Sequence, residues 1–310
     1  MAASSATASG LLALTHTLVA GDLEVVFLPS HGMLCASVRH KGAEILRRVE
    51  NLEAAAAKGS TAGIPFLYPW ANRLAGFRYR AAGREVILDP SSPLLHFDVN
   101  GLPMHGVPWP LLVWELTEAK QDFLKAKLEW SRSDLLAIFP FRHRLELAVT
   151  LQADSLILEM TLVAGPDGPV PVSFGFHPYF GLPELPRAQW RLKLPAMKRL
   201  VLDRHGVPTG EEKPFTELEA RLGDAAFDDG FALIEEQASF SVLGGGRQIT
   251  VEFITGYRYT QIFAPRESDY IALEPMTGPT SALTSGRGLR LVDAGGNFTA
   301  TFRILVEAVA

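Results

Sequence analysis

Ionisable side chains stand at three places in the chain where apolar residues and prolines surround them. His105 lies between two prolines in the stretch LPMHGVPW, and His177 lies among four aromatic rings in SFGFHPYF. Glu274 follows an apolar stretch in YIALEPM and is followed at once by Pro275, which can end a strand. A carboxyl group and an imidazole that face one substrate can pass protons to and from it. These residue types therefore point to acid–base chemistry.

Two further places carry polar groups suited to holding a substrate. Asn72 and Arg73 follow the run GIPFLYPWA, whose two prolines are expected to present the guanidinium from a stiff loop. That planar group offers a fixed fork of donors to hydroxyls or carboxylates. Asp228 and Asp229 adjoin in FDDGF, where Asp-Asp-Gly is equally typical of a turn. Each residue alone also fits a structural role, so their combination is what predicts a site.

Aromatic surroundings are expected to shift the pKa values of Glu274 and His177 in opposite directions. Burial disfavours the charged form of a group, so a dry pocket is expected to raise the pKa of Glu274 and to lower that of His177. A raised carboxyl pKa suits reversible proton transfer near neutral pH. For His177 to serve as a protonated acid, a nearby carboxylate must offset the effect of burial on its pKa.

The elements expected to position these residues are strands with one buried face. From Phe141 to Leu151 most odd positions are apolar and the even positions between them are mostly polar. The turn sequence Ala153-Asp154-Ser155 follows, and the alternation resumes over Leu156–Leu162, which predicts an antiparallel hairpin. The same period of two recurs in several other stretches: Leu23–Leu28, Lys125–Trp130, Arg247–Ile254, Tyr257–Phe263 and Phe298–Val306.

Helical signals are few. Asn51–Lys58 and Thr216–Leu222 are expected to form short helices that end at glycines, whereas Gly244-Gly245-Gly246 predicts a hairpin turn. No linker, composition shift or internal repeat divides the chain. We therefore predict a flexible tail at residues 1–10 and a single all-β domain at 11–310, built as a large antiparallel β-sandwich.

The composition limits the classes of partner. The chain has 310 residues with 29 Lys and Arg against 34 Asp and Glu, and this net charge of −5 argues against a nucleic-acid partner. The lone cysteine, Cys35, leaves no internal disulfide framework. No basic region precedes an early apolar stretch, so we expect a cytoplasmic protein without a membrane partner. Motifs for phosphate loops, zinc sites and nucleophile elbows do not occur, so no metal is expected.

Six short motifs, in order along the chain, resemble those of the aldose 1-epimerase (galactose mutarotase) family. They are PWANRLAGFRY at 69–79, MHGV at 104–107, FHPYF at 176–180, LVLDRHGVPTG at 200–210, FDDGF at 227–231 and LEPMTGPTSALTSG at 273–286. The resemblance implies the family's large antiparallel β-sandwich, in agreement with the strand pattern. It also implies an isomerase that acts on a small-molecule sugar, and we expect a monomer or a homodimer. Because anomers already interconvert slowly in water, no cofactor is expected.

The resemblance also assigns roles to the singled-out residues. Glu274 falls on the family's catalytic base and His177 on its general acid. Four residues fall on positions at or beside the sugar: His105, which helps to bind and polarise it, Arg73, its neighbour Asn72, and Asp228, which matches better than Asp229. The residues after Glu274 differ from those of the classical galactose mutarotases, so the preferred sugar does not carry over.

Other interpretations stay open at this stage. A phosphorylated hexose is the alternative within the family, and it would need extra cations, for which the candidates are Arg78, Arg80, Arg266 and Arg287. A glycoside hydrolase could use Asp228 and Glu274 as its carboxylate pair. A non-catalytic carbohydrate-binding protein would bind a sugar without changing its anomer.

Overall fold

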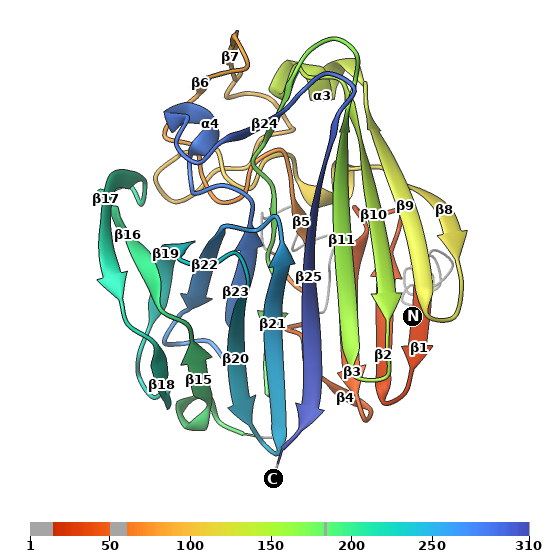
Figure 1. Ribbon diagram of the computed structural model, residues 1–310, viewed down its shortest axis with the longest axis vertical. Coiled ribbons are helices and arrows are strands. Elements are labelled where there is room, and N and C mark those ends of the chain that lie inside the picture. Colours follow the sequence, from red (N-terminus) through yellow and green to blue (C-terminus); the bar gives the residue numbers. More distant parts are fainter. Residues whose placement is uncertain (1–14, 50–60, 183–184, 310) are drawn as a thin grey trace, which may run out of the picture.

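The computed structural model describes residues 15–49, 61–182 and 185–309. Within these ranges the strands form a nine-stranded sheet (sheet A), an eight-stranded sheet (sheet B), a four-stranded sheet (sheet C) and two two-stranded ribbons (Figure 1). Neighbouring strands in the two large sheets run antiparallel, as the alternating sequence predicts. The expected tail at 1–10 and the expected helix Asn51–Lys58 lie outside the described residues.

Sheet A is built mainly of long strands from the second half of the chain. In spatial order it contains β18 (Leu218–Arg221), β15 (Arg191–Leu194), β20 (Ala238–Gly244), β21 (Arg247–Thr255), β25 (Asn297–Ala308), β11 (Ser155–Ala164), β10 (His143–Leu151), β9 (Phe123–Trp130) and β8 (Glu115–Ala119).

Sheet B carries most of the strands that reach the candidate residues. In spatial order it contains β17 (Pro208–Phe215), β16 (Met197–Leu202), β19 (Phe227–Leu233), β22 (Tyr259–Ala264), β23 (Ile271–Met276), β13 (Gly175–Phe176) and β5 (Phe66–Leu67), and β14 (Tyr179–Phe180) also pairs with β23.

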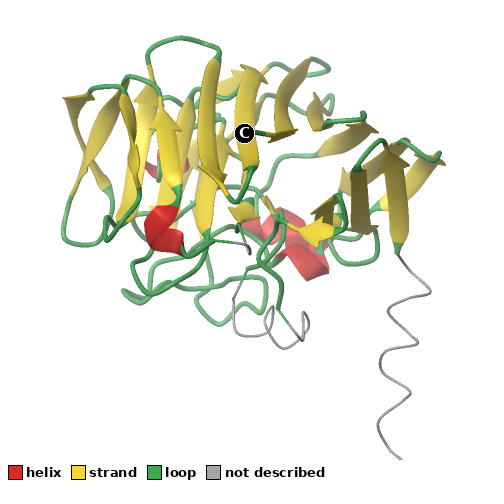
Figure 2. Cartoon of the chain, turned by 90° about the horizontal axis from the view of Figure 1, so that it is seen from below, coloured by secondary structure: helices red, strands yellow, loops and turns green. Residues whose placement is uncertain are grey.

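The remaining elements are short and flank the two large sheets. Sheet C contains β1 (His16–Ala20), β2 (Leu23–Leu28), β3 (Leu34–His40) and β4 (Ala43–Glu44), and the ribbons pair β6 (Arg78–Ala81) with β7 (Arg84–Ile87) and β12 (Val170–Val172) with β24 (Arg290–Val292). Among the described residues the helices are α3 (Ser133–Ile138), α4 (Ala282–Ser285) and two 3₁₀ turns, Trp109–Leu111 and Arg187–Gln189. Figure 2 shows how small a part helices play beside the strands. None of the described helices is long and apolar enough to cross a membrane.

The predicted hairpins are confirmed, and their alternation explains the core. In β10 the odd positions are buried and the even positions are partly exposed, and β10 pairs with β11 in register from His143–Ala164 to Leu151–Leu156. The glycine triplet forms the turn between β20 and β21, where Gly245 and Gly246 adopt positive φ angles of 58° and 72°. Aromatic side chains fill the space between the large sheets: the ring of Phe176 lies 5.2 Å from that of Phe302 on β25. The fold is therefore the predicted β-sandwich.

Two local predictions are wrong. The segment Thr216–Leu222 contains the strand β18 rather than a helix, because Leu218–Arg221 pairs with β15 along the edge of sheet A. This tertiary pairing outweighs the weak helical preference of so short a segment. Pro275 does not end its strand either, since β23 continues to Met276. Pro275 pairs with Thr260 on one side and has no ladder partner in β13 on the other, so its missing N–H costs no ladder bond there.

Candidate active site

The six residues singled out from the sequence line one cavity of about 310 Å³, a volume at the lower end of the usual range for small-molecule sites. Sheet B supplies part of the lining directly from its strands, and loops supply the rest. The six are Asn72, Arg73, His105, His177, Asp228 and Glu274. A neighbouring hollow of about 420 Å³ reaches neither His177 nor Glu274, and it shares four lining residues with this cavity: Thr61, His96, Met104 and His105.

Glu274 and His177 touch inside the cavity. Glu274 projects from the middle of β23 with 2% of its surface exposed, and its Oε1 lies 3.2 Å from His177 Nε2. His177 occupies the link between β13 and β14, where its backbone N–H donates to the carbonyl of Pro65. The hydroxyl of Tyr179 lies 2.9 Å from the same Nε2, and its ring stacks on the imidazole at 4.0 Å between centroids. The imidazole is therefore fixed in place beside the carboxyl group.

Burial sets the protonation of this pair. It raises the pKa of the Glu274 carboxyl well above its usual range, and the nearby Asp228 carboxylate raises it further while Arg73 opposes the shift. Burial also lowers the pKa of His177 well below its usual range, and the His105 and Arg47 side chains add to this effect. Burial therefore shifts both groups toward their neutral forms, a protonated carboxyl group and an imidazole with a single ring N–H.

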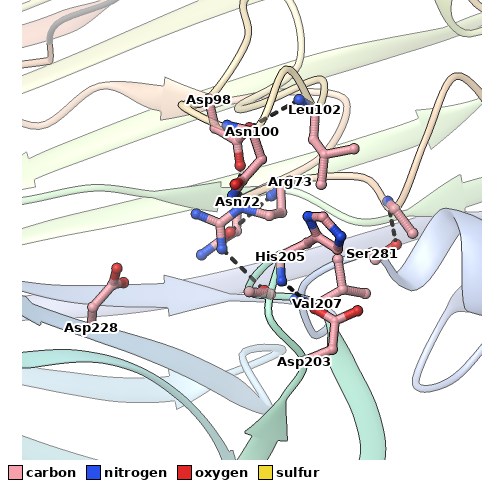
Figure 3. Close-up of polar contacts among 12 residues, drawn as sticks. Asn72, Arg73, Asp98, Asn100, Leu102, Asp203, His205, Val207, Asp228 and Ser281 are labelled. Atoms are coloured by element: carbon pink, nitrogen blue, oxygen red, sulfur yellow. Dashed lines mark hydrogen bonds and ion pairs between the residues drawn. The ribbon is translucent and has the colours of Figure 1, made fainter.

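Arg73 is held by two neighbouring loops rather than lying free at the surface. Its Nε donates to Oδ2 of Asp98 at 2.8 Å, and its Nη1 donates to the carbonyl of Gly206 at 3.0 Å (Figure 3). The Asp98 carboxylate in turn accepts the backbone N–H groups of Asn100 and Leu102. The guanidinium is thus preorganised at the cavity wall with its charge balanced by a carboxylate.

Asn72 and His105 are joined by a hydrogen bond between their backbones. Both adopt left-handed conformations, with φ of 55° and 59°, and the His105 N–H donates to the Asn72 carbonyl at 2.8 Å. The Asn72 amide oxygen accepts the N–H of Arg73, which suits asparagine to this conformation. Burial, followed by the nearby His96 and Arg73 charges, lowers the pKa of His105 to about 3. Its imidazole is therefore neutral at physiological pH.

The adjacent aspartates of β19 point to opposite faces of sheet B. Asp228 lines the cavity, and its Oδ1 accepts a hydrogen bond of 2.7 Å from the side chain of Gln261. Asp229 instead accepts a hydrogen bond of 2.9 Å from Arg199 Nε on β16. Successive residues of a strand alternate between faces, so only Asp228 is placed to meet a ligand in this cavity. In Figure 3, Asp228 stands apart from the Arg73 cluster.

Several cavity residues were not singled out from the sequence. Gln261 is a polar side chain within an alternating strand, and Tyr179 belongs to the FHPYF motif, so each left a recognisable signal. Tyr270 begins the stretch YIALEPM, in which only Glu274 was singled out. Arg47 and Thr61 also line the cavity, and nothing in their local sequence marks them, because they reach the site through long-range contacts.

Other predicted features fall elsewhere. The four arginines considered for a phosphate, Arg78, Arg80, Arg266 and Arg287, are not among the residues that line the cavity. In the described part of the chain, no three His, Cys, Asp or Glu side chains gather in a way that could hold a metal ion.

The protein is thus an all-β protein of the antiparallel sandwich class, and its polar cavity holds a buried carboxyl–imidazole pair. The chain belongs to the aldose 1-epimerase family, whose family model matches residues 15–305. The match covers nearly the whole chain and includes every residue of the candidate site.

Solved structures share this fold over almost their full lengths. The Slr1438 protein from Synechocystis sp. PCC 6803 is 25% identical with a TM-score of 0.78, covering 95% of this chain and 96% of that one. A putative aldose 1-epimerase from Escherichia coli K12 is 23% identical with a TM-score of 0.76, covering 95% and 99%. A galactose mutarotase-like protein from Clostridium acetobutylicum is 17% identical with a TM-score of 0.83, covering 94% and 95%.

One curated relative matches only in part. The uncharacterized protein YphB of Escherichia coli K12 is 28% identical over 170 residues, which is 53% of this chain and 54% of that protein. The chain therefore spans about half the length of this relative.

Proposed function

We propose that this protein is an aldose 1-epimerase that interconverts the α and β anomers of a hexose. The observation that carries the proposal is the contact of 3.2 Å between Glu274 Oε1 and His177 Nε2 inside a cavity lined by polar side chains. One group takes a proton and the other gives one, which is what opening and closing a hemiacetal ring requires.

The polar lining supplies the sugar-binding groups in this proposal. Arg73 donates from a fixed guanidinium, and Asp228 accepts from sugar hydroxyls. His105 is neutral, so it can donate or accept a hydrogen bond without adding charge to the cavity. Its Nδ1 is buried and has no hydrogen-bond partner among the described residues, which leaves that atom for a sugar hydroxyl. The rings of Tyr179 and Phe263 offer apolar surface to the sugar C–H groups.

Proton transfer then proceeds in two mirrored stages. The Glu274 carboxylate removes the proton of the C1 hydroxyl, while protonated His177 donates to the ring oxygen. The bond between C1 and the ring oxygen breaks and leaves an open-chain aldehyde. After rotation about C1–C2, neutral His177 takes the proton back from the C5 hydroxyl as that oxygen attacks C1, and Glu274 reprotonates the carbonyl oxygen.

The proton count of the pair is consistent with this cycle. The neutral pair, a protonated Glu274 carboxyl beside a neutral His177, holds the same number of protons as the ionised pair, a Glu274 carboxylate beside a protonated His177. The two forms differ by transfer of a single proton across the contact between them. A bound sugar, whose hydroxyls hydrogen-bond to the charged groups, favours the ionised form that burial alone disfavours. The site therefore starts and ends each turnover in the same protonation state.

Polarimetry of freshly dissolved α-glucose and α-galactose, together with a reducing-end assay on oligosaccharides, tests the proposal. We expect faster relaxation of the optical rotation and no new reducing ends. New reducing ends would indicate the glycoside hydrolase, with Asp228 and Glu274 as its pair. Saturable sugar binding without any change in rate would indicate a non-catalytic binding protein.

A further inference from the structure

Arg47 brings a second cation to the cavity from outside sheet B. It follows β4, and its backbone N–H donates to the carbonyl of Tyr179 at 2.9 Å. Its own carbonyl accepts the N–H of Gly63 at 3.1 Å, and the preceding residue, Leu46, forms a bridge with Phe180. These contacts fix the Arg47 backbone directly beside β14, the strand that follows His177.

The side chain of Arg47 is also held by contacts with its neighbours. Its Nη1 donates to the carbonyl of Thr61 at 2.9 Å, and its Cζ lies 4.6 Å from the ring centroid of Tyr270 and 5.6 Å from that of Tyr179. Stacking on two rings holds a guanidinium without using its remaining N–H donors. These contacts hold the guanidinium among three residues that also line the cavity, Thr61, Tyr179 and Tyr270.

No carboxylate among the described residues forms an ion pair with Arg47, in contrast to Arg73, which is paired with Asp98. The cavity holds one other acid besides Glu274, namely Asp228, which already accepts from Gln261. The charged contact of Glu274 is with His177 rather than with Arg47, and burial also raises the pKa of this carboxyl group. A partly buried cation with unused donors is a binding group for an anion.

Arg47 also lines an outer hollow of about 600 Å³ and is the one described residue shared by that hollow and the cavity. The acids of the hollow are Glu44 and Asp269, of which Glu44 accepts from the N–H groups of Val38 and Leu46. Arg47 thus borders both spaces, and a substituent that extends toward it from a sugar in the cavity meets its guanidinium.

We infer that Arg47 selects a hexose that carries an anionic substituent, either a uronic carboxylate or a phosphoryl group, remote from C1. This inference rests on the proposed function, since it names the substrate class of the same cavity. The anionic oxygens accept from the free N–H groups of Arg47 while Glu274 and His177 act at C1. Arg47 is therefore a specificity-determining residue, and a neutral hexose is the poorer substrate.

Binding of sugars that cannot open separates this inference from catalysis. Anhydroglucitol lacks the C1 hydroxyl, and calorimetry would compare it with its 6-phosphate and with the corresponding uronic acid. We expect the wild-type protein to bind at least one anionic analogue on the order of 10- to 100-fold more tightly than the neutral one, as one charge-assisted hydrogen bond allows. The preference should shrink as ionic strength rises.

Two arginine variants provide a matched comparison. Arg47→Gln and Arg78→Gln remove the same charge, but Arg78 is exposed and lines neither the cavity nor the outer hollow. We expect Arg47→Gln to weaken binding of the anionic analogue at least tenfold more than binding of the neutral one, and Arg78→Gln to retain the wild-type preference. Arg47→Lys, which keeps the charge but not the fork, should fall between them.

The outcomes are distinct. Equal wild-type affinity for neutral and anionic analogues, or equal loss of both in Arg47→Gln, would overturn the inference. If glucose is epimerised but glucuronate and glucose 6-phosphate are not preferred, the inference fails while the proposed function stands. If the anionic analogues bind with the predicted preference but no sugar is epimerised, the proposed function fails instead. Preference for only one of the two anions identifies the substituent.

Discussion

Replacing Glu274 with glutamine tests the acid–base pair at its most buried member. The amide keeps the size of the carboxyl group and can still meet His177 Nε2, now 3.2 Å from Glu274 Oε1, but it cannot accept a proton from the C1 hydroxyl. A positioned general base contributes about 10²- to 10⁴-fold to a rate. We therefore expect kcat to fall by about that factor, while the affinity for anhydroglucitol changes little.

The same substitution is not expected to destabilise the protein. The pKa of Glu274 is raised in the folded protein, chiefly by burial, above the value of about 4.3 that an unfolded chain has. A group with a raised pKa contributes full stability below the unfolded value and loses it as pH rises toward the folded value. The carboxyl group therefore lowers the free energy of unfolding by about 1.4 kcal/mol for each pH unit above its unfolded pKa, up to its folded pKa. Glutamine does not ionise, so Tm at pH 7 should not fall.

Polarimetry and thermal denaturation on one preparation check both halves of this prediction. Glu274→Asp is the matched control, since it keeps the acid but withdraws it from His177, and it should retain more activity than Glu274→Gln. Full activity in Glu274→Gln would refute the role of the carboxyl group. A large drop in Tm together with lost activity would refute the account of its burial, because the loss would then be structural.

Three smaller predictions concern the surrounding groups. Tyr179→Phe keeps the stacked ring but removes the hydroxyl beside His177, so kcat should fall about two- to tenfold and its pH profile should shift, with KM nearly unchanged; an unaltered pH profile would argue against a positioning role. Burial alone would raise the pKa of Asp98, but backbone N–H groups and Arg73 outweigh it and lower that pKa. Asp98→Asn should therefore cost about 1–3 kcal/mol in denaturant unfolding at pH 7, and the difference should shrink as pH falls below about 4; a constant difference would contradict this. Because the pKa of His105 is about 3, its ring proton signals in NMR spectra should not move between about pH 5 and 8, and a transition there would contradict its burial.

The strand pattern was predictable because a strand with one buried face alternates apolar and polar residues along the sequence. β10 and β11 emerge as predicted, since each alternate side chain must either enter the core or meet water. The failures occur where local sequence is weak and tertiary context decides. Leu218–Arg221 becomes an edge strand only because β15 offers a partner, and Pro275 is accommodated only because its neighbour β13 is short.

Some residues of the candidate site could likewise be recognised from the sequence and others could not. Glu274 and His177 were recognisable because ionisable groups in apolar stretches are rare without a reason. Arg47 was not, because it lies in the sequence Leu-Arg-Arg-Val, which is what an ordinary basic surface segment contains. Its place in the cavity depends on the bridge between Leu46 and Phe180, a contact between residues far apart in the chain. No pattern confined to one segment carries that information.

The most direct test of the central claim is the fate of the C1 oxygen during turnover. The account requires the bond between C1 and the ring oxygen to break, driven by Glu274 and His177, while the C1 hydroxyl oxygen stays attached. A hexose labelled with ¹⁸O at C1 should therefore change anomer in the presence of the protein and keep its label over a period in which a buffer control also keeps it. Loss of the label at each inversion would mean that the C1–O1 bond breaks instead, and it would contradict the account.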